Sequence, residues 1–268
     1  MSVEAYAVGS WEVAMGDGQA VRLHCFAHAG AGVSSFYRWD KLAGSGVRTT
    51  PWLLPGRDER RREVRLTTRD ELLSDLKPLF EQIAGEPGAP YVLYGHSLGA
   101  TVALTVAHAA LEYGLPMPAL LAVGASPPPD LPAALANSAG LPDEELLRVL
   151  DRFDALPPGV QPGDVWFRSV FPVLRADLRL ARSLRAAAVA PTAPGPVPVP
   201  VLAVTGSEDP LVGPEAAAGW QRWTTGRFVR RTVPGGHFFV RGGELPRMLG
   251  RAARIVLRPH HTEQGDGR

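Results

Sequence analysis

The chain has 268 residues, of which 45% are hydrophobic and 21% are charged. This composition fits one globular α/β domain with a sizeable core, to which an inserted subdomain can be added. The formal net charge of +1 gives no overall attraction to nucleic acid or to an anionic membrane, so neither is expected as a partner. The longest apolar run is interrupted by His108 and Glu112 and is too short to span a bilayer.

Cysteine content and the first residues both bear on the compartment. Cys25 is the single cysteine, so no disulfide can form within the chain, which suits a reducing cytoplasm. The opening sequence Met-Ser-Val-Glu-Ala-Tyr has neither the basic segment nor the long apolar segment of a secretion signal. A cytoplasmic protein is therefore expected.

The first third of the chain predicts short strands and two helices. Residues 11–14 and 21–27 read as strands joined by a Gly-Asp-Gly turn at 16–18. The second strand runs into the small-residue loop His28-Ala29-Gly30-Ala31-Gly32, which precedes a helix over 34–42. Residues 52–54 predict a further strand, ended by Pro55-Gly56. A helix is expected over 70–83, where apolar residues follow helical spacing and Pro78 favours a kink.

The segment between that strand and that helix is rich in arginine. The basic residues are Arg57, Arg60, Arg61, Arg62 and Arg65, with Asp58, Glu59 and Glu63 interspersed. This mixture of signs is typical of a solvated face, and steering of an acidic partner is the alternative.

The most informative stretch is residues 91–104, Tyr-Val-Leu-Tyr-Gly-His-Ser-Leu-Gly-Ala-Thr-Val-Ala-Leu. Residues 91–94 predict a buried strand, Gly95, Ser97 and Gly99 have G-x-S-x-G spacing, and an alanine-rich helix is expected over about 100–111. This layout is typical of a nucleophile elbow, in which the two glycines avoid clashes with neighbouring backbone. The helix N-terminus would favour negative charge near the serine hydroxyl. An ordinary glycine-bounded turn between a strand and a helix is the alternative.

After a buried strand over 119–125, the chain changes character. Residues 126–200 hold no obvious strand, but they predict helices over about 142–153 and 165–188. A stretch of about seventy residues far exceeds what one crossover between strands needs, so we expect an all-helical insertion. Ordinary crossover helices are the alternative.

Two later strands carry candidate catalytic residues at their ends. Residues 199–205 predict a parallel strand that leads into Gly206-Ser207-Glu208-Asp209-Pro210, where Glu208 and Asp209 are both candidates for the acid of a catalytic triad. An Asp that caps a turn before proline is the alternative for Asp209. Residues 228–233 predict the last strand, and His237 follows it in a glycine loop, where the base of a triad belongs. The order serine, acid, histidine is that of the α/β-hydrolase class.

The same class predicts where an oxyanion would be held. One donor comes from the loop after an early strand and the other from the residue after the serine, which indicates the backbone N–H groups of Ala29 and Leu98. A simple glycine loop is the alternative for residues 28–32. Among the other histidines, His96 is expected to support the elbow and His28 to be structural, while His24 and His108 are expected to be core or surface residues. His260 and His261 lack further ligands at suitable spacing, so no metal site is predicted.

These patterns predict an α/β-hydrolase fold, with a mostly parallel central sheet flanked by helices and an inserted helical lid. Residues 1–125 and 199–258 are expected to form the α/β-hydrolase core. Residues 126–198 are expected to form the helical lid, and residues 259–268 a disordered tail.

Several segments together resemble the type II (external, editing) thioesterases that accompany nonribosomal peptide and polyketide synthases. The resemblance covers about residues 20–250 and rests on 26–32 with Phe36, Tyr37 and Trp39, and on 54–57, 95–100, 141–146, 172–177, 206–210 and 235–239. The elbow alone is shared by most serine esterases, whereas the His-Ala-Gly loop, the Pro-Gly-Arg turn and the Leu-Arg-Ala-Asp segment are more specific. Three places depart from the usual residues of the family, namely Ala31, Glu208 and the Ser126-Pro127-Pro128-Pro129 segment.

This resemblance implies a serine hydrolase that cleaves acyl thioesters from the phosphopantetheine arm of carrier proteins, and so removes aberrant or stalled acyl groups from a synthase. Ser97, Asp209 and His237 would form the catalytic triad, with Asp209 preferred to Glu208. No metal or bound cofactor is implied, because the substrate carries its own phosphopantetheine. The implied partners are acyl carrier protein or peptidyl carrier protein domains, and the protein is expected to be a monomer.

Three other functions stay open at this point. One is a stand-alone carboxylesterase that acts on oxygen esters of small alcohols. Another is an acyltransferase or cyclase, in which an amine or alcohol replaces water and the same triad serves. The third is a non-enzymatic binding partner of a synthase that keeps the fold without the chemistry.

Overall fold

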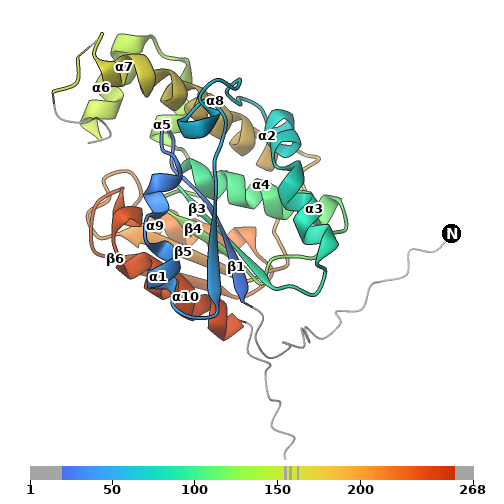
Figure 1. Ribbon diagram of the computed structural model, residues 1–268. Coiled ribbons are helices and arrows are strands. Elements are labelled where there is room, and N and C mark those ends of the chain that lie inside the picture. Colours follow the sequence, from blue (N-terminus) through green and yellow to red (C-terminus); the bar gives the residue numbers. More distant parts are fainter. Residues whose placement is uncertain (1–19, 154–155, 157–158, 162, 257–268) are drawn as a thin grey trace, which may run out of the picture.

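A parallel sheet forms the centre of the molecule. The computed structural model describes residues 20–256 apart from 154–155, 157–158 and 162. Within them, six strands pair in the order β2-β1-β3-β4-β5-β6, and every neighbouring pair is parallel (Figure 1). The strands are β1 (Val21–Phe26), β2 (Val47–Trp52), β3 (Tyr91–His96), β4 (Leu120–Gly124), β5 (Val201–Gly206) and β6 (Phe228–Val233). The strand predicted over 11–14, the turn at 16–18 and the tail predicted over 259–268 lie outside the described residues.

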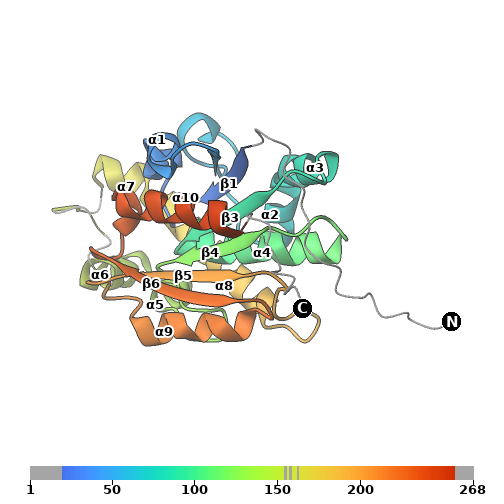
Figure 2. The same ribbon diagram turned by 90° about the horizontal axis from the view of Figure 1, so that it is seen from below.

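Helices cover both faces of this sheet, which confirms the predicted α/β architecture. The α-helices are α1 (Trp39–Ala43), α2 (Arg69–Asp75), α3 (Lys77–Gly85), α4 (Leu98–Glu112), α5 (Ala134–Asn137), α6 (Asp143–Arg152), α7 (Val165–Ser169), α8 (Phe171–Ala188), α9 (Pro214–Ala218) and α10 (Glu244–Val256). The 3₁₀ helices are η1 (Val33–Phe36), η2 (Asp58–Arg60), η3 (Ser138–Gly140), η4 (Gly219–Trp223) and η5 (Phe239–Arg241). Helices α1 and α10 pack on one face, and α4, α8 and α9 lie on the other (Figure 2). No helix in the part of the chain that the structure describes combines the length and the apolar character needed to cross a membrane.

The inner strands send alternate side chains to the two faces. In β3, Val92 and Tyr94 belong to the core under α1 and α10, whereas Tyr91 and Leu93 belong to the core under α4. Every residue of β3, β4 and β5 is buried, as their continuous apolar sequences predict. The strand that leads to Ser97 is therefore held from both faces and from both neighbouring strands.

Prolines break two helices that the sequence pattern predicts as continuous. Residues 70–83 lie in two helices that meet at Leu76, because Pro78 occupies the first turn of α3, where a missing N–H costs nothing. Residues 165–188 likewise form α7 and then α8, with Pro172 in the first turn of α8. The helix predicted over 34–42 is instead η1 and α1, separated at Arg38, whose φ is +65°.

The strand predicted over residues 52–54 is misplaced. β2 ends at Trp52, where the prediction places its start. It is an edge strand that pairs only with β1, and Arg48, Thr49 and Thr50 give it no apolar run that the sequence pattern could reveal.

Helices α5, α9 and α10 form where the sequence pattern predicts none. α10 packs on α1 through the buried side chains of Leu245, Leu249 and Ala253. Its Pro246 and Gly250 obscure the helical pattern. Gly250 has a packing role, because a Cβ at this position would overlap the carbonyl oxygen of Ala43 in α1.

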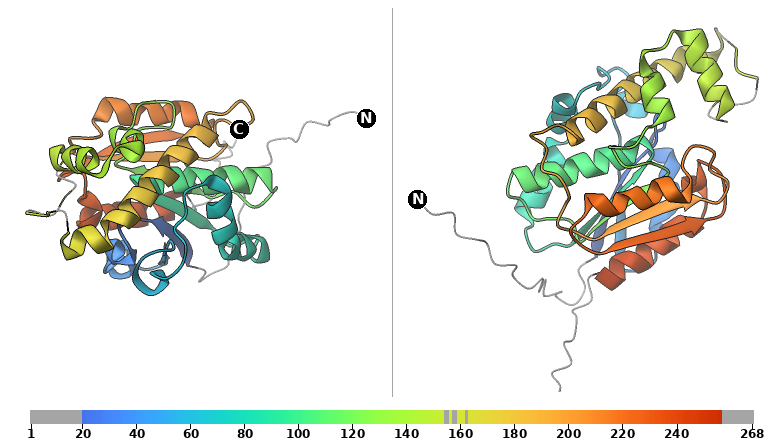
Figure 3. Two further views of the ribbon diagram at one scale, coloured as in Figure 1. Left: turned by 90° about the horizontal axis from the view of Figure 1, so that it is seen from above. Right: turned by 180° about the vertical axis from the view of Figure 1, so that it is seen from behind.

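Residues 126–198, which we call the helical insertion, connect β4 to β5. In their described part they form α5, η3, α6, α7 and α8, together with an isolated bridge from Val197 to Thr224, and no strand. The long helix α8 lies across α4 at the top of the molecule (Figure 3). The division of the chain into a core and a lid remains a prediction.

Gly99 of the elbow should be sensitive to substitution. A Cβ at Gly99 would overlap the carbonyl oxygen of Phe26, whereas no heavy atom lies within 4 Å of a Cβ at Gly88. We expect Gly99→Ala to lower the free energy of unfolding by about 1–3 kcal/mol or more, because packed backbone cannot yield. The Gly88→Ala control should change it by less than about 0.5 kcal/mol. Urea denaturation measures both, and equal stabilities would contradict this packing.

Candidate active site

Ser97 lies between the end of β3 and the start of α4, in the sharp turn that the G-x-S-x-G spacing predicts. Its φ is +55°, a left-handed conformation that is uncommon for a residue with a Cβ. Its amide donates to the carbonyl oxygen of Gly124 at 2.8 Å, which ties the turn to β4. The nucleophile elbow expected from the sequence is therefore present in the backbone.

Three side chains from distant parts of the chain form one hydrogen-bonded row. His237 Nε2 lies 3.2 Å from Ser97 Oγ, and His237 Nδ1 lies 3.0 and 3.1 Å from the two carboxylate oxygens of Asp209. A carboxylate can only accept, so the neutral imidazole carries its proton on Nδ1 and presents Nε2 to the hydroxyl of Ser97. The arrangement suits transfer of the serine proton to the imidazole.

Asp209 both caps a turn and faces the imidazole. Its Oδ1 accepts from the amides of Leu211 at 2.9 Å and Val212 at 3.2 Å, so the turn-capping alternative describes part of its environment. Glu208, the other acidic candidate, is exposed and lies on an open hollow outside His237. Of the two candidates, Asp209 is the one whose carboxylate contacts His237.

His96, next to Ser97, supports the site through the backbone of His237. Its Nε2 lies 2.7 Å from the carbonyl oxygen of His237, and its Nδ1 lies 2.7 Å from the hydroxyl of Tyr94. Since a carbonyl oxygen can only accept, His96 Nε2 carries the proton and Nδ1 accepts from Tyr94. Complete burial, followed by the nearby His28 and His237, holds the pKa of His96 well below its usual value and keeps the ring neutral.

Ala29 and Leu98, whose backbone N–H groups are predicted to hold an oxyanion, border the same cavity as Ser97. Leu98 is the first residue of α4, where backbone N–H groups lack partners within the helix. Among the described residues, the N–H of Ala29 has no hydrogen-bond acceptor. The next amide, that of Gly30, donates to Asp177 at 2.7 Å. Both residues thus adjoin the cavity beside Ser97, and the role of their N–H groups stays a prediction.

An apolar cavity of about 60 Å³ adjoins Ser97 and His237. Its far wall belongs to the helical insertion and includes Ala133, Leu135, Ala136, Leu178 and Ala181. On the other side of His237, an open hollow of about 580 Å³ is lined by residues that include Phe153, Pro210 and Phe238. His237 borders both spaces, whereas Ser97 borders the cavity.

Two buried arginines near the site escaped sequence prediction. Arg57 does not lie on a solvated face as expected. It is buried and pairs with Asp177 of α8, at 2.8 Å for Nη1–Oδ2 and 2.6 Å for Nη2–Oδ1. Arg185 borders the cavity and donates to the backbone carbonyl oxygens of Pro127, Pro128, Pro129 and Leu131. Asp177 is 120 residues from Arg57, so no local pattern marks the pair, while Arg61, Arg62 and Arg65 are exposed as a solvated face requires.

The remaining described histidines are core residues. His24 Nδ1 accepts from the indole N–H of Trp52 at 3.1 Å, and His108 Nε2 lies 2.9 Å from the carbonyl oxygen of Gly195. His28 is buried between the rings of His96 and Phe238. Within the described residues, no three side chains of His, Cys, Asp or Glu cluster as metal ligands. His260 and His261 lie outside the described residues.

Comparisons with known proteins agree on one family. Residues 21–254 match the family model described as Thioesterase domain. The thioesterase PikA5 of Streptomyces venezuelae is 31% identical over 222 residues, which cover 82% of this chain and 76% of that protein. The solved structure of RedJ, a thioesterase of the prodiginine pathway in Streptomyces coelicolor, gives a TM-score of 0.75 at 33% identity and covers 94% of this chain and 96% of RedJ. The type II thioesterase BorB of the borrelidin biosynthetic cluster gives 0.69 at 29% identity, over 90% of this chain and 94% of BorB. The predicted α/β-hydrolase fold is thereby confirmed.

The buried histidines should make stability depend on pH. Burial, and then the charge of Arg22, lowers the pKa of His24 to about 4, while burial, and then Arg241, His237 and Arg57, lowers that of His28 to about 3. Below pH 6.5 these two histidines bind protons in the unfolded chain but stay neutral in the folded chain. The stability that their neutral state provides is therefore complete above pH 6.5 and is lost as the pH falls towards 4. From pH 7.5 to 5.5 each histidine should remove about 1.4 kcal/mol from the free energy of unfolding.

Denaturant unfolding at the two pH values measures this loss. A His24→Leu variant, whatever its absolute stability, should lose about 1.4 kcal/mol less than the wild type over the same interval. A variant with an unchanged dependence on pH would contradict a neutral His24 in the folded chain.

Tyr94 should affect the reactivity of Ser97 without touching it. Tyr94→Phe leaves His96 Nδ1 buried without a donor and loosens the hold on His237, so we expect slower labelling of Ser97 by a fluorophosphonate and a loss of about 1–3 kcal/mol of stability. Tyr91→Phe is the matched control, because its hydroxyl donates to the Pro116 carbonyl oxygen at 2.6 Å at the other end of β3. It should lose stability but keep the labelling rate. Equal labelling rates in both variants would argue against this role of His96.

Proposed function

The chain belongs to the thioesterase family, and we propose that it is a serine hydrolase that cleaves acyl thioesters from the phosphopantetheine arm of carrier proteins. In this role it removes aberrant or stalled acyl groups from a polyketide or nonribosomal peptide synthase. The observation that carries the proposal is the row of Ser97, His237 and Asp209 beside an apolar cavity. The likeness to thioesterases from biosynthetic clusters supports the substrate class.

The first half of the reaction acylates the enzyme. His237 Nε2 takes the proton of Ser97 as Oγ attacks the thioester carbonyl carbon, and Asp209 orients the imidazole and stabilises its cationic form. The N–H groups of Ala29 and Leu98 hold the oxyanion, and each such donor is worth about 3–4 kcal/mol. When the C–S bond breaks, His237 returns its proton to the thiolate, and the phosphopantetheine thiol leaves.

The second half releases the acid. Water takes the place of the thiol and gives a proton to His237 as its oxygen attacks the acyl-serine. The C–O bond to Ser97 breaks, Oγ recovers the proton from His237, and the free carboxylic acid departs. The protein groups in this sequence are the triad and the two amides, and the substrate supplies its own phosphopantetheine.

The two spaces beside His237 suit the two halves of such a substrate. The cavity walled by Leu178 and Ala181 of α8 would take the acyl chain. The open hollow beside Phe238 would take the pantetheine arm, so the carrier domain would stay at the surface. In this proposal the helical insertion acts as the lid over the acyl chain.

Removal of the nucleophile tests the proposal. Ser97→Ala should lower turnover of acyl-loaded carrier protein by about 10⁴-fold or more and leave the thermal midpoint unchanged, while the exposed Ser34→Ala control should keep full activity. Intact-mass measurement of a panel of acyl-loaded carriers reads out which acyl groups are removed. Turnover close to wild type in Ser97→Ala would refute the assigned nucleophile. Faster cleavage of small oxygen esters than of matched acyl-pantetheine thioesters would favour a stand-alone carboxylesterase.

A further inference from the structure

One face of α8 contributes both to the cavity and to the support of the loop 28–32. Leu178 and Ala181 line the cavity, and Leu174 closes the space beside Gly30, where a Cβ would lie 3.4 Å from the Leu174 Cβ. Asp177 comes from the same stretch of the helix and bonds to that loop. Positions three and four apart share a helix face, so the cavity wall and the support of the loop move as one element.

Asp177 and Arg57 form hydrogen bonds to the loop immediately after Ala29. Asp177 Oδ2 accepts from the Gly30 N–H at 2.7 Å and from Arg57 Nη1 at 2.8 Å, while its Oδ1 accepts from Arg57 Nη2 at 2.6 Å. Arg57 Nη1 also donates to the carbonyl oxygen of Ala31 at 2.9 Å. An amide and a carbonyl group of the loop are thus held by one ion pair.

The ion pair that holds the loop is buried. The side chains of Arg57 and Asp177 are 8% and 2% exposed. Asp177 accepts from Arg57 and the loop, while Arg57 donates to Asp177, to the loop and, at 3.4 Å, to the carbonyl oxygen of Pro55. The Gly30 N–H belongs to the peptide group that directly follows Ala29, and fixing it restricts the orientation of the Ala29 backbone. Any movement of α8 away from the loop breaks hydrogen bonds to a charged group, which are the strong ones.

We propose that Arg57 and Asp177 are a positioning pair that couples the loop 28–32, the oxyanion loop, to α8. The Ala29 N–H is then correctly placed only while α8 stays packed against this loop. The inference rests on the proposed function and adds a source of specificity to it. An acyl chain too long for the cavity pushes on Leu178 and Ala181, which displaces Asp177 and with it the loop. Such chains are penalised in kcat as well as in binding.

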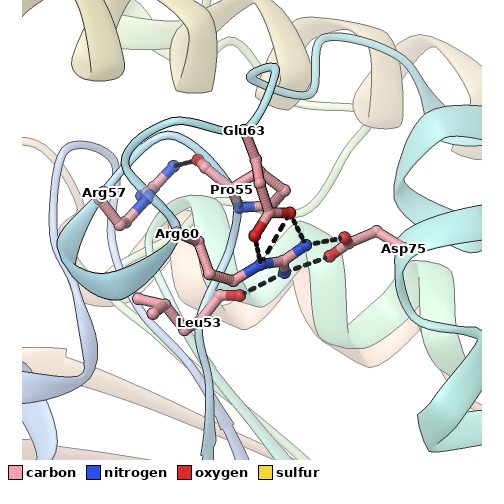
Figure 4. Close-up of polar contacts among 6 residues, drawn as sticks. All are labelled: Leu53, Pro55, Arg57, Arg60, Glu63 and Asp75. Carbon is pink, nitrogen blue, oxygen red and sulfur yellow. Dashed lines mark hydrogen bonds and ion pairs between the residues drawn. The ribbon is translucent and has the colours of Figure 1, made fainter.

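The chain offers a matched control for this pair. Arg60, three residues after Arg57, forms a second two-pronged pair with Asp75 of α2, at 2.5 Å for Nη2–Oδ1 and 3.0 Å for Nη1–Oδ2, and also binds Glu63 (Figure 4). Its backbone contact is the carbonyl oxygen of Leu53, and the bonds of its guanidinium do not extend to residues 28–32. Asp75→Asn therefore removes the carboxylate that pairs with a neighbouring arginine of the same segment, without releasing the loop.

The test compares Asp177→Asn with Asp75→Asn in the full chain. We expect Asp177→Asn to lower kcat by about 100-fold with KM within about threefold, because misplacing an oxyanion donor costs transition-state binding. Its affinity for a boronic acid that mimics the tetrahedral intermediate should fall in parallel, and Asp75→Asn should stay within about twofold of the wild type. A loss in kcat without a loss of boronic acid affinity, or equal losses in the two variants, would overturn the proposal.

A double variant separates positioning from folding. Arg57→Met with Asp177→Leu replaces the buried pair by apolar side chains, an exchange that often preserves stability. If the pair positions the loop, kcat stays low although the thermal midpoint recovers. Recovery of kcat together with the midpoint would show a purely structural pair and overturn the proposal.

A second substrate keeps this test independent of the carrier protein. All variants are also assayed on p-nitrophenyl acetate, whose cleavage uses the same serine and oxyanion site. A loss specific to Asp177→Asn on this ester supports the positioning pair even where acyl-loaded carriers are not turned over. Failure on carriers by the wild type contradicts the proposed function alone, whereas equal rates of both Asn variants on the ester contradict the positioning pair alone.

Discussion

The site depends on how closely three pieces of backbone approach one another at the end of β3. A Cβ at Gly95 would overlap the carbonyl oxygen of Gly99, and a Cβ at Gly99 would overlap that of Phe26. The first contact lets the chain reverse from β3 into α4 around Ser97. The second brings the end of β1 against the first turn of α4, so the loop that follows β1 emerges beside the amide of Leu98. The same two glycines thus bring Ser97, Ala29 and Leu98 to one cavity.

Three histidines near the site differ in their polar surroundings. His28 and His96 lie with their ring centroids 5.8 Å apart, and those of His96 and His237 are also 5.8 Å apart. Burial keeps His28 and His96 neutral by lowering the pKa of each. The carboxylate of Asp209 is the acidic group in contact with His237. In the proposed mechanism, an imidazolium formed at His237 would be stabilised by this carboxylate.

Sequence patterns located the features of this site that are local in the chain. Ser97 and Asp209 follow the buried strands β3 and β5, and His237 follows the edge strand β6. Parallel strands end at one edge of a sheet, so the meeting of these residues could be expected from spacing and order alone. What the patterns could not give depends on contacts between distant segments. Arg57 was read as part of a solvated run because its partner lies 120 residues away. β2 was misplaced because an edge strand needs no apolar run, and α10 was missed because Gly250 serves its contact with α1 rather than its helical propensity.

Two arginine side chains hold α8 in place through hydrogen bonds, one on each side of the residues of α8 that line the cavity. Towards the start of α8, Asp177 accepts hydrogen bonds from Arg57 and from the loop after β1. Towards its end, Arg185 donates to the carbonyl oxygens of the proline segment after β4. The cavity-lining residues Leu178 and Ala181 lie between these attachments. Apolar contacts can slide at little cost, but a buried charge that leaves its hydrogen bonds loses several kcal/mol or so. Two polar anchors therefore hold the helix that forms one wall of the cavity, and the helical insertion contributes residues to the lining of the candidate site.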